Sequence, residues 1–140
     1  MMHDFKQEQG EKLPHGPFCH EPRTWQKKFQ DAFRGLVLSI RQQSSFRVHL
    51  LFAILVPMAA FGLQLDLVEW CILLLSIFAV MSAEMFNTAI ETLAKAITKD
   101  HNMHIGLALD IASGAVLLVC IGASLVGACI FIQALVKVFC

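Results

Sequence analysis

Two carboxylates and an amide, Glu84, Asn87 and Glu91, follow a long apolar stretch of the chain. Residues 71–83 are almost entirely apolar, so the three polar side chains belong to a predicted membrane span. A carboxylate there costs about 2.5 kcal/mol or more, which makes it a functional hypothesis by default. Steps of three and four residues place all three side chains on one helix face. The pattern predicts one of two arrangements. Either both carboxylates hold a divalent cation, or one binds the metal and the other acts as a general base. The structural alternative is polar contact between packed helices.

Composition indicates a membrane protein. The chain has 140 residues, of which 56% are hydrophobic, and its mean hydropathy is +0.63. That is too apolar for an ordinary soluble domain of this size. The formal net charge is zero, which gives no indication of a nucleic-acid partner. Residues 1–21 are polar and contain Pro14, Gly16 and Pro17, and we expect them to form a flexible tail.

The rest of the chain, residues 22–140, predicts an all-α membrane domain. Over 22–45 apolar residues recur at three- and four-residue steps between basic ones, a pattern typical of a helix in the membrane interface. The alternative for this segment is a soluble amphipathic helix packed on a partner. Three apolar segments of membrane-spanning length follow, at 48–65, 68–92 and 111–136.

The basic residues predict the orientation in the membrane. The basic residues that precede the first span include Lys27, Lys28, Arg34, Arg41 and Arg47. Lys95 and Lys99 follow the second span, whereas the turn between spans one and two carries only acids. The positive-inside rule therefore places the N-terminus and the 95–110 connection in the cytoplasm of a cell whose inner (plasma) membrane holds the protein.

With this orientation the polar stripe lies at the cytoplasmic end of the second span, and Asp110 opens the third. A soluble nucleotide can reach these residues from the cytosol, and a lipid headgroup from the membrane. The arrangement suits phosphoryl transfer to a lipid alcohol, in which Mg²⁺ clamps the phosphates and a carboxylate takes the hydroxyl proton. The sequence contains no Walker A motif and no kinase glycine-rich loop.

Four motifs carry a specific resemblance: Arg34-Gly35-Leu36, Phe46-Arg47, and the segments 84–91 and 110–117. Through them, and over about residues 24–135, the chain resembles the small integral-membrane diacylglycerol kinases, whose members phosphorylate diacylglycerol or undecaprenol. The resemblance implies a surface helix plus three transmembrane helices, assembled as a homotrimer with active sites shared between subunits.

The resemblance also implies roles for individual residues. Glu84 is the general base acting on the lipid hydroxyl, and Asn87 orients that site. Glu91 ligates the Mg²⁺ that accompanies ATP, and Asp110 contacts the nucleotide. Further positions in the implied site are Gln43 for metal and nucleotide, and Arg34, Phe46, Arg47 and Ser113 for the lipid substrate.

The chain departs from the family pattern at three of its positions. Gln43 replaces a metal-binding Glu, Leu109 replaces a Lys that faces the nucleotide, and Lys95 replaces an Asp. Lys95 or Lys99 can supply the missing charge from nearby. The leading hypothesis is an ATP- and Mg²⁺-dependent lipid kinase that makes a phosphatidic-acid-type product. The alternatives are a catalytically weakened relative that binds lipid or supports assembly, and a small oligomeric channel.

Overall fold

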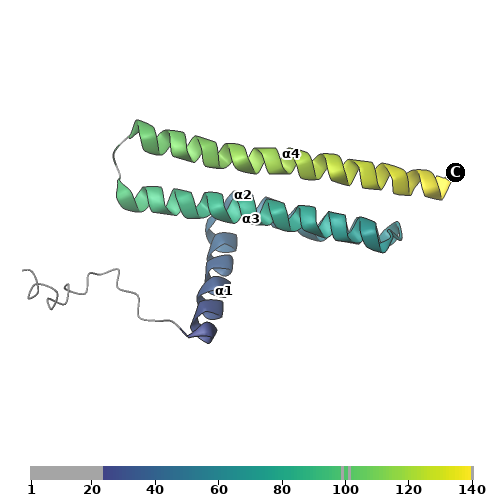
Figure 1. The fold of residues 1–140 in the computed structure, drawn as a ribbon, viewed down its shortest axis with the longest axis horizontal. Coiled ribbons are helices and arrows are strands. Elements are labelled where there is room, and N and C mark those ends of the chain that lie inside the picture. Colours follow the sequence, from purple (N-terminus) through teal and green to yellow (C-terminus); the bar gives the residue numbers. More distant parts are fainter. Residues whose placement is uncertain (1–23, 99, 101, 140) are drawn as a thin grey trace, which may run out of the picture. The chain divides into compact units, whose positions relative to one another are not determined.

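The computed structural model describes residues 24–98, 100 and 102–139, and these form four helices (Figure 1). The helices are α1 (Trp25–Gln42), α2 (Ser44–Gly62), α3 (Leu67–Ile97) and α4 (Met103–Phe139). By length and apolar composition, α2, α3 and α4 can each cross a membrane. The predicted all-α membrane fold is therefore confirmed. The predicted tail, residues 1–21, lies outside the described residues.

Helix α1 carries an aromatic stripe on its surface. The chain divides into two units, one ending at Arg34 and one beginning at Gly35, and the stripe lies in the first. Trp25, Phe29 and Phe33 are spaced by four residues, and each is largely exposed. The Lys28 ammonium lies 4.6 Å from the centre of the Trp25 ring. Aromatic and basic side chains exposed together are suited to a membrane interface.

A single extended residue separates α1 from α2. Gln43 has φ −110° and ψ 122°, which ends α1 and begins α2. The helix predicted over 22–45 is thus interrupted before its end, although the Gln43 N–H still donates to the Ser39 carbonyl at 3.2 Å. The Gln43 side chain makes no capping hydrogen bond to α2. It therefore remains available for contacts elsewhere.

The start of α3 is fixed by a capping box. The Glu69 N–H donates to Asp66 Oδ1 at 2.9 Å, and the Asp66 N–H donates to Glu69 Oε2 at 3.0 Å. Two backbone donors at the helix start are satisfied reciprocally in this way. The preceding turn contains Gln64 with φ 53°, and the predicted first span, 48–65, ends within this turn.

Helices α3 and α4 pack as an antiparallel pair, and α2 also packs on α3 (Figure 1). At one end of the pair Lys137 Nζ of α4 lies 3.0 Å from Glu69 Oε1 of α3. A buried apolar cluster lies near this end. Its members are Ala60, Leu65, Leu73, Ile130 and Ala134.

The connection between α3 and α4 is shorter than the sequence predicts. The segment expected over 95–110 reduces to 98–102, because α3 continues to Ile97 and α4 begins at Met103. Polar residues mark where an apolar span ends. The helix itself can continue beyond that point, because its backbone hydrogen bonds do not require apolar side chains. Asn102 Oδ1 accepts from the N–H groups of His104 at 3.0 Å and Ile105 at 3.3 Å, which starts α4 early. Lys99 and His101 lie outside the described residues.

Candidate functional site

Glu84 is a buried carboxylate on α3. It is only 3% exposed, and no hydrogen bond or ion pair reaches its carboxylate from the part of the chain that the structure describes. The Thr88 hydroxyl donates to the Glu84 backbone carbonyl at 2.9 Å, not to the Glu84 carboxylate. A buried carboxylate without a partner is energetically costly, and such groups cluster at functional sites.

The Glu91 carboxylate makes three contacts with other side chains. Asn87 Nδ2 donates to Glu91 Oε1 at 3.1 Å, and this i, i+4 bond confirms that the two residues share a helix face. Gln43 Nε2 donates to Glu91 Oε2 at 2.7 Å from a position 48 residues away. Lys95 Nζ lies 3.7 Å from the same Oε2. Because Gln43 lies at the break between α1 and α2, its side chain can reach the polar face of α3.

Asn87 carries an unsatisfied acceptor. Its Oδ1 atom is buried and has no hydrogen-bond partner among the described residues. Buried acceptors of this kind are uncommon, and they occur where an ion, a water or a catalytic function completes the site. An amide oxygen and a carboxylate are the kinds of hard oxygen ligand that Mg²⁺ prefers, although in this arrangement Asn87 presents its amide nitrogen to Glu91.

The donor set fits Mg²⁺ held jointly with a substrate rather than a closed metal cage. Within residues 24–98, 100 and 102–139 no three His, Cys, Asp or Glu side chains are grouped to hold a metal. Mg²⁺ is commonly bound by one or two carboxylates together with substrate phosphates and water. Gln43 presents its amide nitrogen to Glu91, so its oxygen joins such a site only if the amide rotates.

Other predicted site residues lie apart from this cluster. Asp110 and Ser113 are exposed on α4, and their side chains make no hydrogen bond or ion pair with described residues. Phe46 is completely buried at the start of α2, whereas Arg47 and Arg34 are exposed. The chain as a single copy thus brings together Gln43, Asn87 and Glu91, with Glu84 on the same face of α3.

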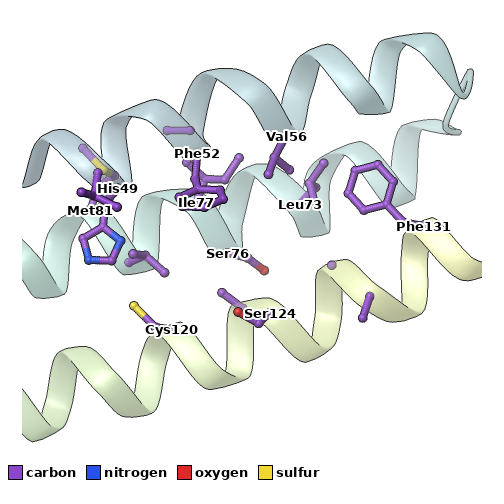
Figure 2. Close-up of a pocket in the computed structure, with 16 residues that line it drawn as sticks. His49, Phe52, Val56, Leu73, Ser76, Ile77, Met81, Cys120, Ser124 and Phe131 are labelled. Atoms are coloured by element: carbon purple, nitrogen blue, oxygen red, sulfur yellow. The ribbon is translucent and has the colours of Figure 1, made fainter. Parts of the chain in front are cut away.

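A groove runs between α2, α3 and α4 and has a volume of about 450 Å³. Figure 2 shows His49, Met81 and Cys120 at one end, and Phe131 towards the other. Most of the lining is apolar. Met81, part of this lining, lies three residues before Glu84 and so on the same side of α3, although Glu84 itself does not line the groove. Sequence periodicity did not reveal the groove, because its walls come from three separate helices.

A second cavity, the end pocket, lies where α3 ends and α4 begins, and it has a volume of about 330 Å³. Glu91 and Lys95 line it from α3, and Leu109 lines it from α4. Asp110, the next residue after Leu109, is not part of this lining. The polar face of α3 therefore borders a cavity at its end, in addition to the groove along its length.

Comparison with known proteins connects this site to a family. The family described as prokaryotic diacylglycerol kinase matches residues 30–131. The undecaprenol kinase of Bacillus subtilis is 34% identical over 109 residues, covering 78% of this chain and 89% of that protein. The diacylglycerol kinase of a Synechocystis species is 33% identical over 111 residues, covering 78% of this chain and 63% of that protein. The matched region includes every residue of the cluster around Glu91 and Glu84.

Proposed function

This chain belongs to the prokaryotic diacylglycerol kinase family, a family of membrane lipid kinases, and we propose that it transfers the γ-phosphate of ATP to a lipid alcohol. The relatives' names give diacylglycerol and undecaprenol as the candidate acceptors. The product is a lipid phosphate, of the phosphatidic-acid type if diacylglycerol is the acceptor. ADP is the second product.

The observation that carries this proposal is the buried, unengaged Glu84 carboxylate on a membrane-spanning helix. In the proposed reaction the lipid hydroxyl attacks the γ-phosphorus, Glu84 takes the hydroxyl proton, and the bond to ADP breaks. A general base must be free to accept a proton, and a carboxylate already held by a cation or several donors is a poorer one. Glu84 meets this requirement, whereas Glu91 does not.

Mg²⁺, when bound with ATP, neutralises charge on the phosphates. We assign its protein ligands to Glu91 and the Asn87 oxygen, with Gln43 in the position to orient Glu91. The support for this assignment is the unsatisfied Asn87 Oδ1 on the same amide whose Nδ2 donates to Glu91, so its oxygen joins Glu91 at one cation after the amide rotates, as for Gln43.

The lipid acceptor enters from the membrane. The apolar groove supports this route, because a hydrocarbon chain fits its lining better than a hydrated ion does, which disfavours the channel alternative. We further propose that the protein lies in the inner (plasma) membrane with its N-terminus and the α3–α4 connection in the cytoplasm. The family also points to a homotrimer, in which the exposed Asp110 and Ser113 are available to a neighbouring copy.

The test is transfer of labelled γ-phosphate from ATP to diacylglycerol, undecaprenol and ceramide in mixed micelles with Mg²⁺. We expect one labelled lipid product from the wild type, and a loss of about 10²–10⁴-fold in Glu84→Gln, the range typical of a general base. Glu69→Gln, at the opposite end of α3, is the matched control and should retain activity. Absence of product from folded wild type would contradict the kinase, and full activity in Glu84→Gln would remove Glu84 from the base role.

A further inference from the structure

Three side chains that suit a soft metal ion line the groove between α2, α3 and α4. They are the His49 imidazole of α2, the Met81 thioether of α3 and the Cys120 thiol of α4. Figure 2 shows all three at the same end of the groove, with the His49 ring drawn between the two sulfur-bearing side chains. Each comes from a different helix, so the grouping depends on how the helices pack.

The register of α3 and α4 supports this grouping. The two helices are antiparallel, and Ser76 of α3 approaches Ser124 of α4 between the ends of the groove (Figure 2). Met81 lies five residues beyond Ser76, and Cys120 lies four residues before Ser124. Because the helices run in opposite directions, both steps lead a little more than one turn towards the same end.

The metal-binding atoms of this trio are not used by the fold. All three residues are half-buried, and the Cys120 thiol is free. Neither this thiol nor the His49 ring makes a hydrogen bond with another of the described residues. Most of the surrounding lining is apolar. An imidazole in such a place lacks a polar partner, and a bound ion would supply one.

The types of ligand select the ion. Thiolate and thioether sulfurs favour Cu(I), and imidazole also binds copper. The thiol loses its proton to solvent on binding, so one Cu⁺ and one thiolate together carry no net charge. Zn²⁺ with the same thiolate would retain a positive charge in an apolar lining, which is costly. No three His, Cys, Asp or Glu side chains are grouped to hold a metal in the described part of the chain, so the Met81 thioether is needed as the third ligand.

We propose that His49, Met81 and Cys120 bind Cu(I) at this end of the groove. The bound ion joins α2, α3 and α4 at a place that is otherwise accessible to a hydrocarbon chain. It therefore excludes the lipid acceptor, and Cu(I) inhibits the enzyme in competition with the lipid. Only this inhibition rests on the proposed function, because the metal site is defined by the three side chains alone.

The binding test titrates the detergent-solubilised protein with Cu(I) buffered by the chromogenic chelator bicinchoninate, without oxygen and with ascorbate as reductant. Cys120→Ser and Met81→Leu nearly preserve side-chain size, so both are expected to fold. Each should bind Cu(I) at least about tenfold more weakly than the wild type, since loss of even an outer partner of a metal ligand costs about that much.

Matched controls exist for both sulfur ligands. Cys129 is free and exposed on α4, Met58 is exposed on α2, and neither lines the groove. Cys129→Ser and Met58→Leu should therefore bind Cu(I) as the wild type does. X-ray absorption at the copper edge should show sulfur and nitrogen bonded to the ion in the wild type, and the nitrogen should be lost in His49→Leu.

The activity test measures phosphate transfer at rising lipid concentration, with each variant compared with its own rate in the absence of metal. Cu(I) should raise the KM of the wild type for the lipid and leave the KM for ATP unchanged. Excess bicinchoninate should reverse the effect, and Cys120→Ser should not show it. Cys129→Ser should respond to Cu(I) like the wild type.

The outcomes separate the metal site from the proposed function. Equal affinity for Cu(I) in the wild type, Cys120→Ser and Met81→Leu would overturn the site, whether or not the protein is a kinase. Tighter binding of Zn²⁺ than of Cu(I) would overturn the choice of ion. If Cu(I) binds as expected but no lipid is phosphorylated in its absence, the metal site stands and the kinase fails. If Cu(I) binds and the lipid KM does not change, exclusion of the lipid is rejected.

Discussion

The two ends of the α3–α4 pair contain similar residues, but they differ in how fully the polar side chains are paired by hydrogen bonds and ion pairs. At the capped end, Asp66 and Glu69 close a capping box, and Lys137 lies 3.0 Å from Glu69. At the pocket end, Glu91 and Lys95 lie 3.7 Å apart, and the Asn87 Oδ1 has no partner among the described residues. Both ends have a Glu–Lys pair, but only one has its remaining donors and acceptors accounted for.

The difference separates a structural use of charge from a functional one. The capped end uses each charged group to satisfy backbone donors or to join two helices, which stabilises the pair and leaves nothing for a ligand. The pocket end leaves an acceptor unsatisfied and a lysine largely exposed beside a cavity. A buried acceptor without a hydrogen-bond partner destabilises the free protein. It is therefore expected where a bound ligand supplies the missing partner.

Among the variants that test the difference between the two ends, Glu91→Ala should have the largest effect on activity. Removing the carboxylate takes away the central acceptor of the cluster and the proposed ligand of Mg²⁺. We expect the Mg²⁺ concentration for half-maximal activity to rise at least about tenfold, with a smaller change in the lipid KM. The measurement is a Mg²⁺ titration of phosphate transfer at saturating lipid. An unchanged Mg²⁺ requirement would show that Glu91 is not a metal ligand.

Gln43→Glu sharpens the comparison by adding charge at the pocket end. A carboxylate in place of the amide lies against Glu91, and without a cation the repulsion should destabilise the protein by about 1 kcal/mol. Mg²⁺ should reverse the loss, because two carboxylates can share one cation. Thermal denaturation in detergent, with and without Mg²⁺, measures both effects. Gln30→Glu, at an exposed position of α1 outside the membrane spans, is the control. Equal stabilisation of the two variants by Mg²⁺ would argue against a cation site at Gln43.

Much of the fold follows from local sequence patterns. Apolar length predicts the three membrane helices, and the steps of three and four residues place Asn87 and Glu91 on one face, which their hydrogen bond confirms. The boundaries are less accurate because a polar residue such as Lys95 ends an apolar span without ending the helix. Asn102, which caps α4, marks the true boundary.

The site is predictable only in part, because its contacts are long-range. Periodicity cannot bring Gln43 to Glu91 across 48 residues; the resemblance alone placed Gln43 in the site. Nor does the sequence determine that Leu109, rather than Asp110, lines the end pocket, because that depends on how α4 is rotated about its axis. The roles of Glu84, Asp110, Ser113 and the other implied site residues remain predictions.

Lys137→Met should have the smallest effect and tests the comparison from the other side. The Lys137 side chain is 63% exposed, so loss of its pair with Glu69 should lower the free energy of unfolding by less than about 1 kcal/mol. Catalysis should be unaffected, since Lys137 and the end pocket lie at opposite ends of the helix pair. The measurements are thermal denaturation and the KM for ATP, each beside Lys95→Met. If Lys137→Met raised the KM for ATP as much as Lys95→Met does, the nucleotide would be responding to overall charge, and the distinction between the two ends would be wrong. A loss of stability without a change in KM would show that Lys137 serves only to hold the two helices together.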